Sequence, residues 1–168
     1  MKKSVFRLYR NKIFSAILSV CMIAVTVLTG AAPLTGAETV LDNLAIGAAA
    51  FCDVTHKDFP ASGLTDGNTT FDNGHTMIVQ NTASFSIILD LGQMTTFNRL
   101  TLVPSADSPA YFVGSFTVKT AGDDGQYQEI KQFPAPPAPS DQTPVNFDLD
   151  NSVSARYVRL EIVSPWTG

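Results

Sequence analysis

The feature that most constrains the fold of this chain is a series of short runs in which apolar and polar residues alternate with a period of two. In residues 156–163, for example, Val158, Leu160 and Ile162 share one face of an extended strand, and mostly polar residues alternate with them. No stretch after residue 37 keeps apolar residues at helical spacing for three turns. The sequence therefore predicts strands that bury one face and expose the other.

Six segments of this kind predict strands, at residues 84–91, 97–103, 115–120, 127–132, 145–149 and 156–163. Glycine-containing turns occur between them, as in Asp123-Asp124-Gly125, which we expect to close a hairpin. Five prolines within residues 133–144 exclude a central strand there and predict an exposed loop within one domain. Many short strands without helices predict an all-β fold, a jelly-roll β-sandwich.

The N-terminus has the pattern of a signal peptide. The first twelve residues carry five basic groups and no acidic one, and residues 13–28 are almost entirely apolar. Small residues follow, and a peptidase that requires small side chains can use Thr35 and Ala37. We therefore predict that residues 1–37 are removed, that the exported protein starts at Glu38, and that it is secreted or held at the cell surface without a transmembrane span. An uncleaved membrane anchor is the alternative.

The 131 residues after this segment suit a single domain, which we place at residues 38–168. They contain six basic and fifteen acidic residues, so nucleic acid is excluded as a partner. Cys52 is their one cysteine, so no internal disulfide is expected. We expect Cys52 to be a small, half-buried hydrophobic residue rather than a reactive thiol.

Several phrases of the sequence, in this order, resemble the discoidin domain, also called the coagulation factor 5/8 type C domain, a family that includes the family 32 carbohydrate-binding modules. They are Asn43-Leu44-Ala45-Ile46-Gly47, Leu64-Thr65-Asp66-Gly67-Asn68-Thr69-Thr70, Ile88-Leu89-Asp90-Leu91-Gly92 with Phe97-Asn98-Arg99-Leu100, Phe116-Thr117-Val118, and Ala155-Arg156-Tyr157-Val158-Arg159-Leu160. The resemblance covers nearly all of the chain after residue 37.

The resemblance implies an eight-stranded jelly roll of the galactose-binding-like type, with its binding site in loops at one end. Phe71 stands where the family commonly has a tryptophan. The family also continues to a closing strand, whereas this sequence ends at Gly168. We therefore expect a fragment that lacks the last strand and belongs to a larger protein with further domains. We also expect an unpaired sheet edge, with the inward faces of Val158, Leu160 and Ile162 less covered.

A structural calcium ion is a further expectation from the resemblance. It implies the carboxylate of Asp66 as a ligand, with main-chain carbonyls of Gly63 and Asn68 and oxygens of Thr70. Calcium prefers six to eight oxygen ligands, and a tight loop can supply several of them. The alternative is that Asp66-Gly67-Asn68 is only a turn with a side-chain hydrogen bond.

Binding is predicted rather than catalysis, because the sequence lacks the motifs of nucleophilic and metal-dependent enzymes. The chain is interpreted as a carbohydrate-binding module that recognises a glycan or polysaccharide, with an ancillary domain of a glycoside hydrolase as one setting. Loop residues offered as ligand-binding groups are His56, Lys57, His75, Tyr111 and Phe112. An adhesion or protein- or lipid-headgroup-binding module is the alternative, with Tyr111-Phe112 as an exposed apolar spike. Each of these side chains could instead be solvated or tucked under its own loop.

Overall fold

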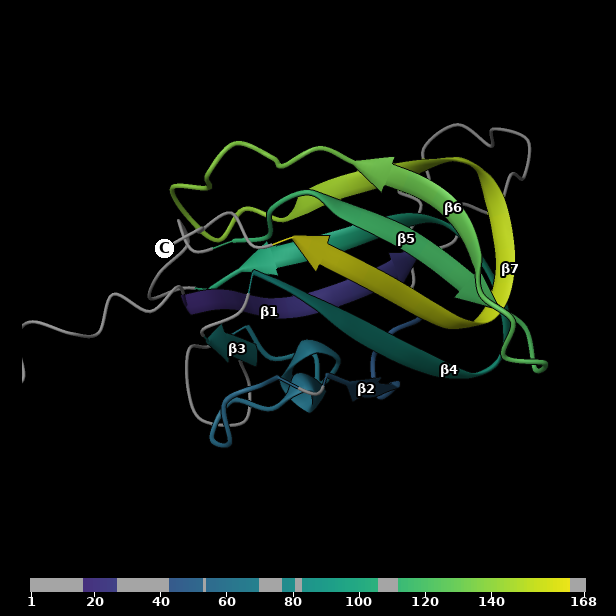
Figure 1. Cartoon of the computed structure of the whole chain (residues 1–168), viewed down its shortest axis with the longest axis horizontal. Coiled ribbons are helices and arrows are strands. Elements are labelled where there is room, and N and C mark those ends of the chain that lie inside the picture. Colours follow the sequence, from purple (N-terminus) through teal and green to yellow (C-terminus); the bar gives the residue numbers. More distant parts are fainter. Residues whose placement is uncertain are drawn as a thin grey trace, which may run out of the picture.

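The computed structural model describes residues 17–26, 43–52, 54–69, 77–80, 83–105 and 112–163. The elements in order are β1 (Ile17–Thr26), β2 (Ala49–Phe51), the 3₁₀ helix η1 (Ala61–Leu64), β3 (Met77–Gln80), β4 (Ser84–Pro104), β5 (Phe116–Ala121), β6 (Gln128–Phe133) and β7 (Val145–Val163). All pairings are antiparallel (Figure 1). The prediction of an all-β fold is confirmed. None of the described helical residues forms a segment long and apolar enough to cross a bilayer.

Two long strands, β4 and β7, run through both layers of the sandwich. The sequence predicted each of them as two separate strands, whereas the structure joins the halves through a bend. In β4 the bend includes Gly92, whose φ of 79° suits glycine, and the pairing with β7 is interrupted between Asp90 and Thr95. The sharp bend lets one continuous strand serve both layers.

The register of pairing defines the two layers. In the first layer, β2 pairs with the start of β4, which pairs with the end of β7, and β5 and β6 follow. In the second layer, β3 pairs with β1, β1 with the end of β4, and the end of β4 with the start of β7. Figure 1 shows β4 and β7 turning at the same end of the molecule.

The core lies between the layers and is built from the inward faces of these strands. Val158 and Leu160 are completely buried and Ile162 nearly so, as the alternation predicted. These faces are covered in the chain that keeps residues 17–26, and lower coverage in residues 38–168 alone stays a prediction. Their strand is paired on both sides, by β4 and by β5. Rings of β5, β6 and β7 also pack together, with the Phe116 and Phe147 centroids 4.8 Å apart.

The apolar segment that the sequence predicts as part of a signal peptide includes β1 in this structure. It lies between β3 and the end of β4 and is paired with both. This is a property of the chain with its N-terminus attached, and removal of residues 1–37 stays a prediction. The predicted start at Glu38 lies outside the described residues.

The predicted hairpin between β5 and β6 is confirmed. Gly125 has a φ of 67°, its N–H donates to the carbonyl of Gly122, and the carboxylate of Asp124 accepts the N–H of Gln126. The proline-rich segment after β6 forms a mostly exposed connection to β7, also as predicted. The hairpin joins two paired strands, whereas the proline-rich connection leads from β6 in the first layer to the start of β7 in the second.

Candidate functional site

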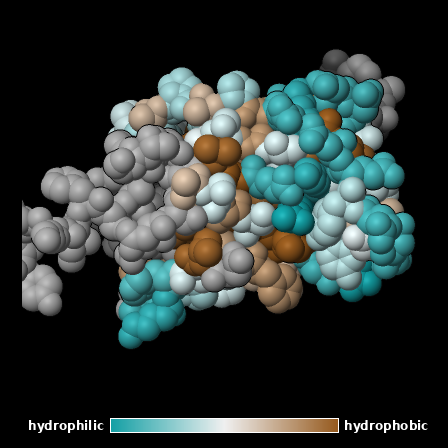
Figure 2. Space-filling view, viewed as in Figure 1, coloured by the Kyte–Doolittle hydropathy of each residue, from teal (hydrophilic) through white to brown (hydrophobic). Residues whose placement is uncertain are grey.

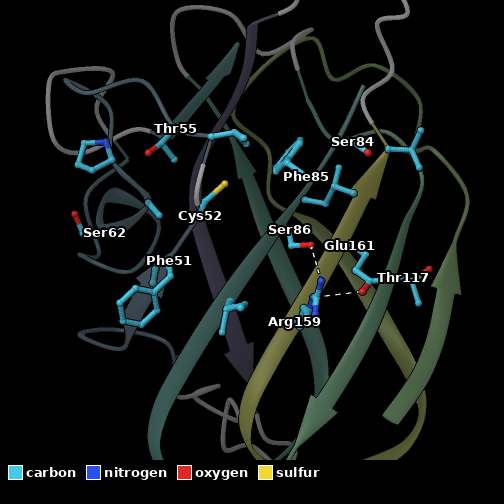
Figure 3. Close-up of a pocket in the computed structure, with 17 residues that line it drawn as sticks. Phe51, Cys52, Thr55, Ser62, Ser84, Phe85, Ser86, Thr117, Arg159 and Glu161 are labelled. Atoms are coloured by element: carbon cyan, nitrogen blue, oxygen red, sulfur yellow. Dashed lines mark hydrogen bonds and ion pairs between the residues drawn. The ribbon is translucent and has the colours of Figure 1, made fainter. Parts of the chain in front are cut away.

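A groove of about 1080 Å³ lies on the outward face of the first layer, at the end where β4 begins and β7 finishes (Figure 3). We call it the β2–β7 groove. One side is formed by β2, the segment after it and η1, and the other by β4, β7 and β5. Its lining includes Phe51, Cys52, Ser86, Ile88, Arg159 and Glu161.

Strand register explains why these side chains meet. Phe51 of β2 is paired with Ile88 of β4, and Ile88 is paired with Arg159 of β7, so all three point to the same face. The next pair on this face joins Ser86, two residues before Ile88, to Glu161, two residues after Arg159. Because alternate residues of these strands fill the core, the polar set must face outward.

The polar side of the groove is a connected network. Arg159 Nη2 donates a hydrogen bond of 3.2 Å to Ser86 Oγ, and Arg159 Nε lies 3.3 Å from Glu161 Oε1. The other carboxylate oxygen, Oε2, lies 2.8 Å from Lys119 Nζ of β5. The Arg159 guanidinium lies over the ring of Tyr127, 5.7 Å from its centroid. These contacts fix the orientation of Arg159 and Glu161.

Tyr127 borders this network on β6's side. Partial burial raises the pKa of its hydroxyl above the usual value, and the positive charge of Arg159 acts in the opposite direction. The hydroxyl therefore stays protonated over the whole neutral range. The network then carries two cations and one carboxylate at neutral pH.

The opposite side of the groove is apolar. The ring of Phe51 is 58% exposed, which is unusual for a large hydrophobic residue of a strand. Cys52 is half-buried and packs against the core, as the sequence predicted. Figure 3 shows Phe51 and Cys52 on one side of β4 and Arg159 and Glu161 on the other. An apolar ring surface thus faces a fixed set of donors and acceptors across one strand.

This arrangement can bind a polyhydroxylated ligand. An aromatic ring packs against the apolar face of a sugar, and a sugar hydroxyl can donate to a carboxylate while it accepts from a guanidinium. Glu161 is the one carboxylate among the described lining residues, and it is already paired with two cations. The described part of the groove therefore offers a carboxylate and a guanidinium as hydrogen-bonding groups for such a ligand.

Two of the predicted ligand-binding residues, His56 and Lys57, lie in the loop that continues from β2. Neither lines the β2–β7 groove. His56 Nδ1 accepts the N–H of Asp58 at 3.2 Å, and its ring packs 5.6 Å from that of Phe59, so the imidazole helps to order its own loop. The Lys57 side chain is largely exposed, with its ammonium 3.9 Å from the Asp58 carboxylate.

The other predicted ligand-binding residues were His75, Tyr111 and Phe112. His75 and Tyr111 lie outside the described residues. Phe112 is 2% exposed and belongs to the core, so it does not form an exposed apolar spike. The prediction of an exposed spike at Phe112 is wrong, because this side chain packs into the core. Nothing in the loop sequence distinguishes a buried aromatic residue from an exposed one.

In the predicted calcium loop, Asp66 Oδ1 accepts the N–H of Asn68 at 2.8 Å, which is the turn that the sequence offered as the alternative. Gly63 donates its N–H to the carbonyl of Pro60, and Thr70 lies outside the described residues. Within the described ranges, no group of three or more His, Cys, Asp or Glu side chains that could hold a metal ion is found. These residues supply one carboxylate of the six to eight oxygens that calcium prefers.

A separate ion-pair cluster lies at the opposite end, where β4 and β7 bend. Arg156 donates from Nε and Nη2 to the two carboxylate oxygens of Asp90, at 3.0 and 3.2 Å, and from Nη1 to Asp123. Hydrogen bonding by Arg156 holds the pKa of the Asp90 carboxyl below its usual value. Figure 2 shows hydrophilic residues concentrated at this end. The cluster ties the bend to the β5–β6 hairpin and has a structural role.

Comparison of the chain with models of protein families gives one match. Residues 48–168 match the model of the F5/8 type C domain. Among curated proteins, none matches the chain significantly. The family match covers all the residues that line the β2–β7 groove.

Solved structures of similar fold include sugar-binding domains. The family 32 carbohydrate-binding module of NanJ from Clostridium perfringens, solved with galactose, has a TM-score of 0.60 at 14% identity and covers 72% of this chain and 85% of that chain. The lectin domain of lectinolysin, solved with the Lewis B antigen, has a TM-score of 0.60 at 21% identity and covers 76% and 89%. A fucosidase from Ruminococcus gnavus matches with a TM-score of 0.51 at 16% identity, over 73% of this chain and 24% of that chain.

Proposed function

Because this chain belongs to the F5/8 type C domain family, we propose that it is an exported carbohydrate-binding module and that the β2–β7 groove holds the sugar. The observation that carries the proposal is the exposed ring of Phe51 across from the Arg159–Glu161 pair. The similarity to domains solved with galactose and with the Lewis B antigen supports a glycan as the ligand.

The groove suits a sugar with adjacent hydroxyls. Phe51 and Arg159 stand two strands apart, so roughly 10 Å separates their backbones. That width allows a ring to pack on Phe51 while its hydroxyls reach Arg159 and Glu161. Since both polar groups are held by Ser86 and Lys119, little side-chain entropy is lost when a ligand binds.

The test is a glycan-array screen followed by titration calorimetry with the best glycan. Phe51→Ala should weaken binding about tenfold, which corresponds to roughly 1.4 kcal/mol and lies within the usual range for one aromatic contact. Glu161→Gln should weaken it by a similar factor, because the amide cannot accept as strongly and leaves Lys119 unpaired. Met94→Ala is the matched control, because Met94 is also exposed but lies outside the groove.

If Phe51→Ala and Glu161→Gln both fold and both keep the wild-type affinity, the sugar binds outside the groove. His56→Ala and Lys57→Ala then test the loop after β2, where the sequence predicted the site. Silence of the folded wild-type chain across galactose-, glucosamine- and fucose-containing glycans would reject the sugar-binding function itself.

We further propose that export removes residues 1–37 and that the module serves a larger protein. The fucosidase match supports the second part, because this fold covers only 24% of that chain. A binding domain of this kind raises the effective concentration of a linked enzyme near its glycan. N-terminal sequencing of the secreted protein tests the cleavage, and a start other than Glu38 would move or reject the predicted site.

A further inference from the structure

The polar side of the β2–β7 groove carries a surplus of positive charge. Arg159 and Lys119 both pair with the carboxylate of Glu161, at 3.3 and 2.8 Å. By contrast, Arg99 pairs with a carboxylate of its own, and Arg156 pairs with two. Two cations that share one carboxylate leave the network one negative charge short of neutral.

The guanidinium of Arg159 also has hydrogen-bond donors to spare. A guanidinium carries five N–H groups. Nη2 donates to Ser86 Oγ, and Nε is buried 3.3 Å from Glu161 Oε1. The hydrogen bonds of the described residues leave both N–H groups of Nη1 without an acceptor. Arg159 lines the groove and its side chain is 35% exposed, so a ligand there can reach the guanidinium.

The acceptors of the groove are already engaged. Glu161 is the one carboxylate among the described lining residues, and its two oxygens face different cations. The other polar lining side chains are hydroxyls, such as those of Ser86 and Thr117, which donate as well as accept. The unused capacity is therefore mainly that of donors beside a positive charge, which suits a ligand group that is anionic and only accepts.

We propose that the sugar held by the β2–β7 groove is an acidic one, a uronic acid whose carboxylate pairs with the guanidinium of Arg159. The inference rests on the proposed function, because it names the class of sugar for the same groove. A carboxylate presents two acceptor oxygens in one plane, which match parallel N–H groups of a guanidinium. Ser86 and the ring of Tyr127 orient Arg159 before the ligand binds, which limits the entropy lost on binding.

Phe51 and Arg159 then recognise different parts of the sugar. The exposed ring of Phe51 packs against the apolar face of the pyranose, which a uronic acid shares with the corresponding neutral sugar. Arg159 recognises the carboxylate, which the neutral sugar lacks. Lys119 acts through Glu161, because it compensates a negative charge that would otherwise repel the ligand, and it is a positioning residue.

The experiment compares methyl galacturonoside with methyl galactoside, which differ only in the carboxylate at C6, by titration calorimetry on the full chain. The readout is the ratio of the two affinities. The wild-type chain should bind the acidic sugar about tenfold more tightly, because hydrogen bonds to charged groups are the stronger ones. Arg159→Gln should reduce this ratio to about one, and about 1 M sodium chloride should also reduce it, because salt screens the ion pair.

Two lysines give a matched pair of variants. Lys119 and Lys131 each pair with a carboxylate, and their side chains are 28% and 27% exposed, but Lys131 pairs with Asp150 rather than with Glu161. Lys119→Gln should lower the ratio about threefold, because Glu161 loses one of its two cations. Lys131→Gln removes the same charge and should leave the ratio unchanged. Phe51→Ala should weaken both sugars and also keep the ratio.

Equal affinity of the wild-type chain for the two sugars would reject the acidic sugar and leave the sugar site standing. A folded Arg159→Gln that keeps the wild-type ratio would reject it as well. If Arg159→Gln does not fold, the lysine pair decides, and equal ratios in Lys119→Gln and Lys131→Gln overturn the inference. Binding of neither sugar also overturns it, and the glycan array then decides separately on the proposed function.

Discussion

Phe112 gives the sharpest test of the structure against the sequence, because the two place its side chain oppositely. The sequence offered it as an exposed loop residue, whereas it is 2% exposed in the core. Truncating a buried phenylalanine to alanine costs about 3–5 kcal/mol in transfer and cavity terms. A domain is usually stable by only about 5–15 kcal/mol, so we expect Phe112→Ala to lower Tm by roughly 10–20 °C.

The assay is thermal unfolding followed by circular dichroism, beside Phe51→Ala as a matched phenylalanine. Phe51 is 58% exposed, and its truncation should change stability by less than about 1 kcal/mol. Affinity for the glycan should show the reverse order, with Phe51→Ala weakened and folded Phe112→Ala unchanged. If Phe112→Ala keeps the wild-type Tm but loses a ligand, the residue is an exposed contact and the core assignment is wrong.

Three further predictions concern single residues. Asp90→Asn should lower the urea midpoint at pH 7, and the difference from wild type should shrink as pH falls below about 4, because a carboxyl whose pKa is depressed in the folded state stabilises only while it is ionised. Gly92→Ala should lower Tm by a few degrees, because a φ of 79° costs a residue with a Cβ about 1–2 kcal/mol although there is space around it. If the predicted calcium site exists, millimolar calcium should raise Tm, and Asp66→Asn should abolish that rise while keeping the turn to Asn68.

Much of the first layer could be predicted because its strands alternate strictly. The inward row of Val158, Leu160 and Ile162 in β7 was recognised from period two alone, and the burial of these residues confirms it. The joining of strand pairs into β4 and β7 could not be predicted, because Gly92 is typical both of a bend within a strand and of a turn between strands. β2 was missed because three residues carry no recognisable period.

The N-terminal segment shows a different limit. A run of apolar residues after a basic N-terminus is typical of a signal peptide. The same apolar composition is also typical of a strand buried on both faces. Local pattern cannot separate the two, because the difference lies in whether β3 and β4 leave a space between them. That information belongs to the pairing of distant residues rather than to the segment itself.

The groove illustrates why binding sites of such domains are hard to predict from loops alone. Histidines and aromatic residues in the connections were the predicted binding groups, and His56 instead orders its own turn. The polar groups of the groove, Arg159 and Glu161, come instead from the outward face of a strand, which in an ordinary sheet simply faces water. What changes their role is β2, which brings Phe51 to the same row through Ile88. An outward strand face becomes a candidate binding site when a neighbouring segment forms a wall beside it. Predicting such a site therefore requires the pairing of the two segments, which the sequence of one strand does not contain.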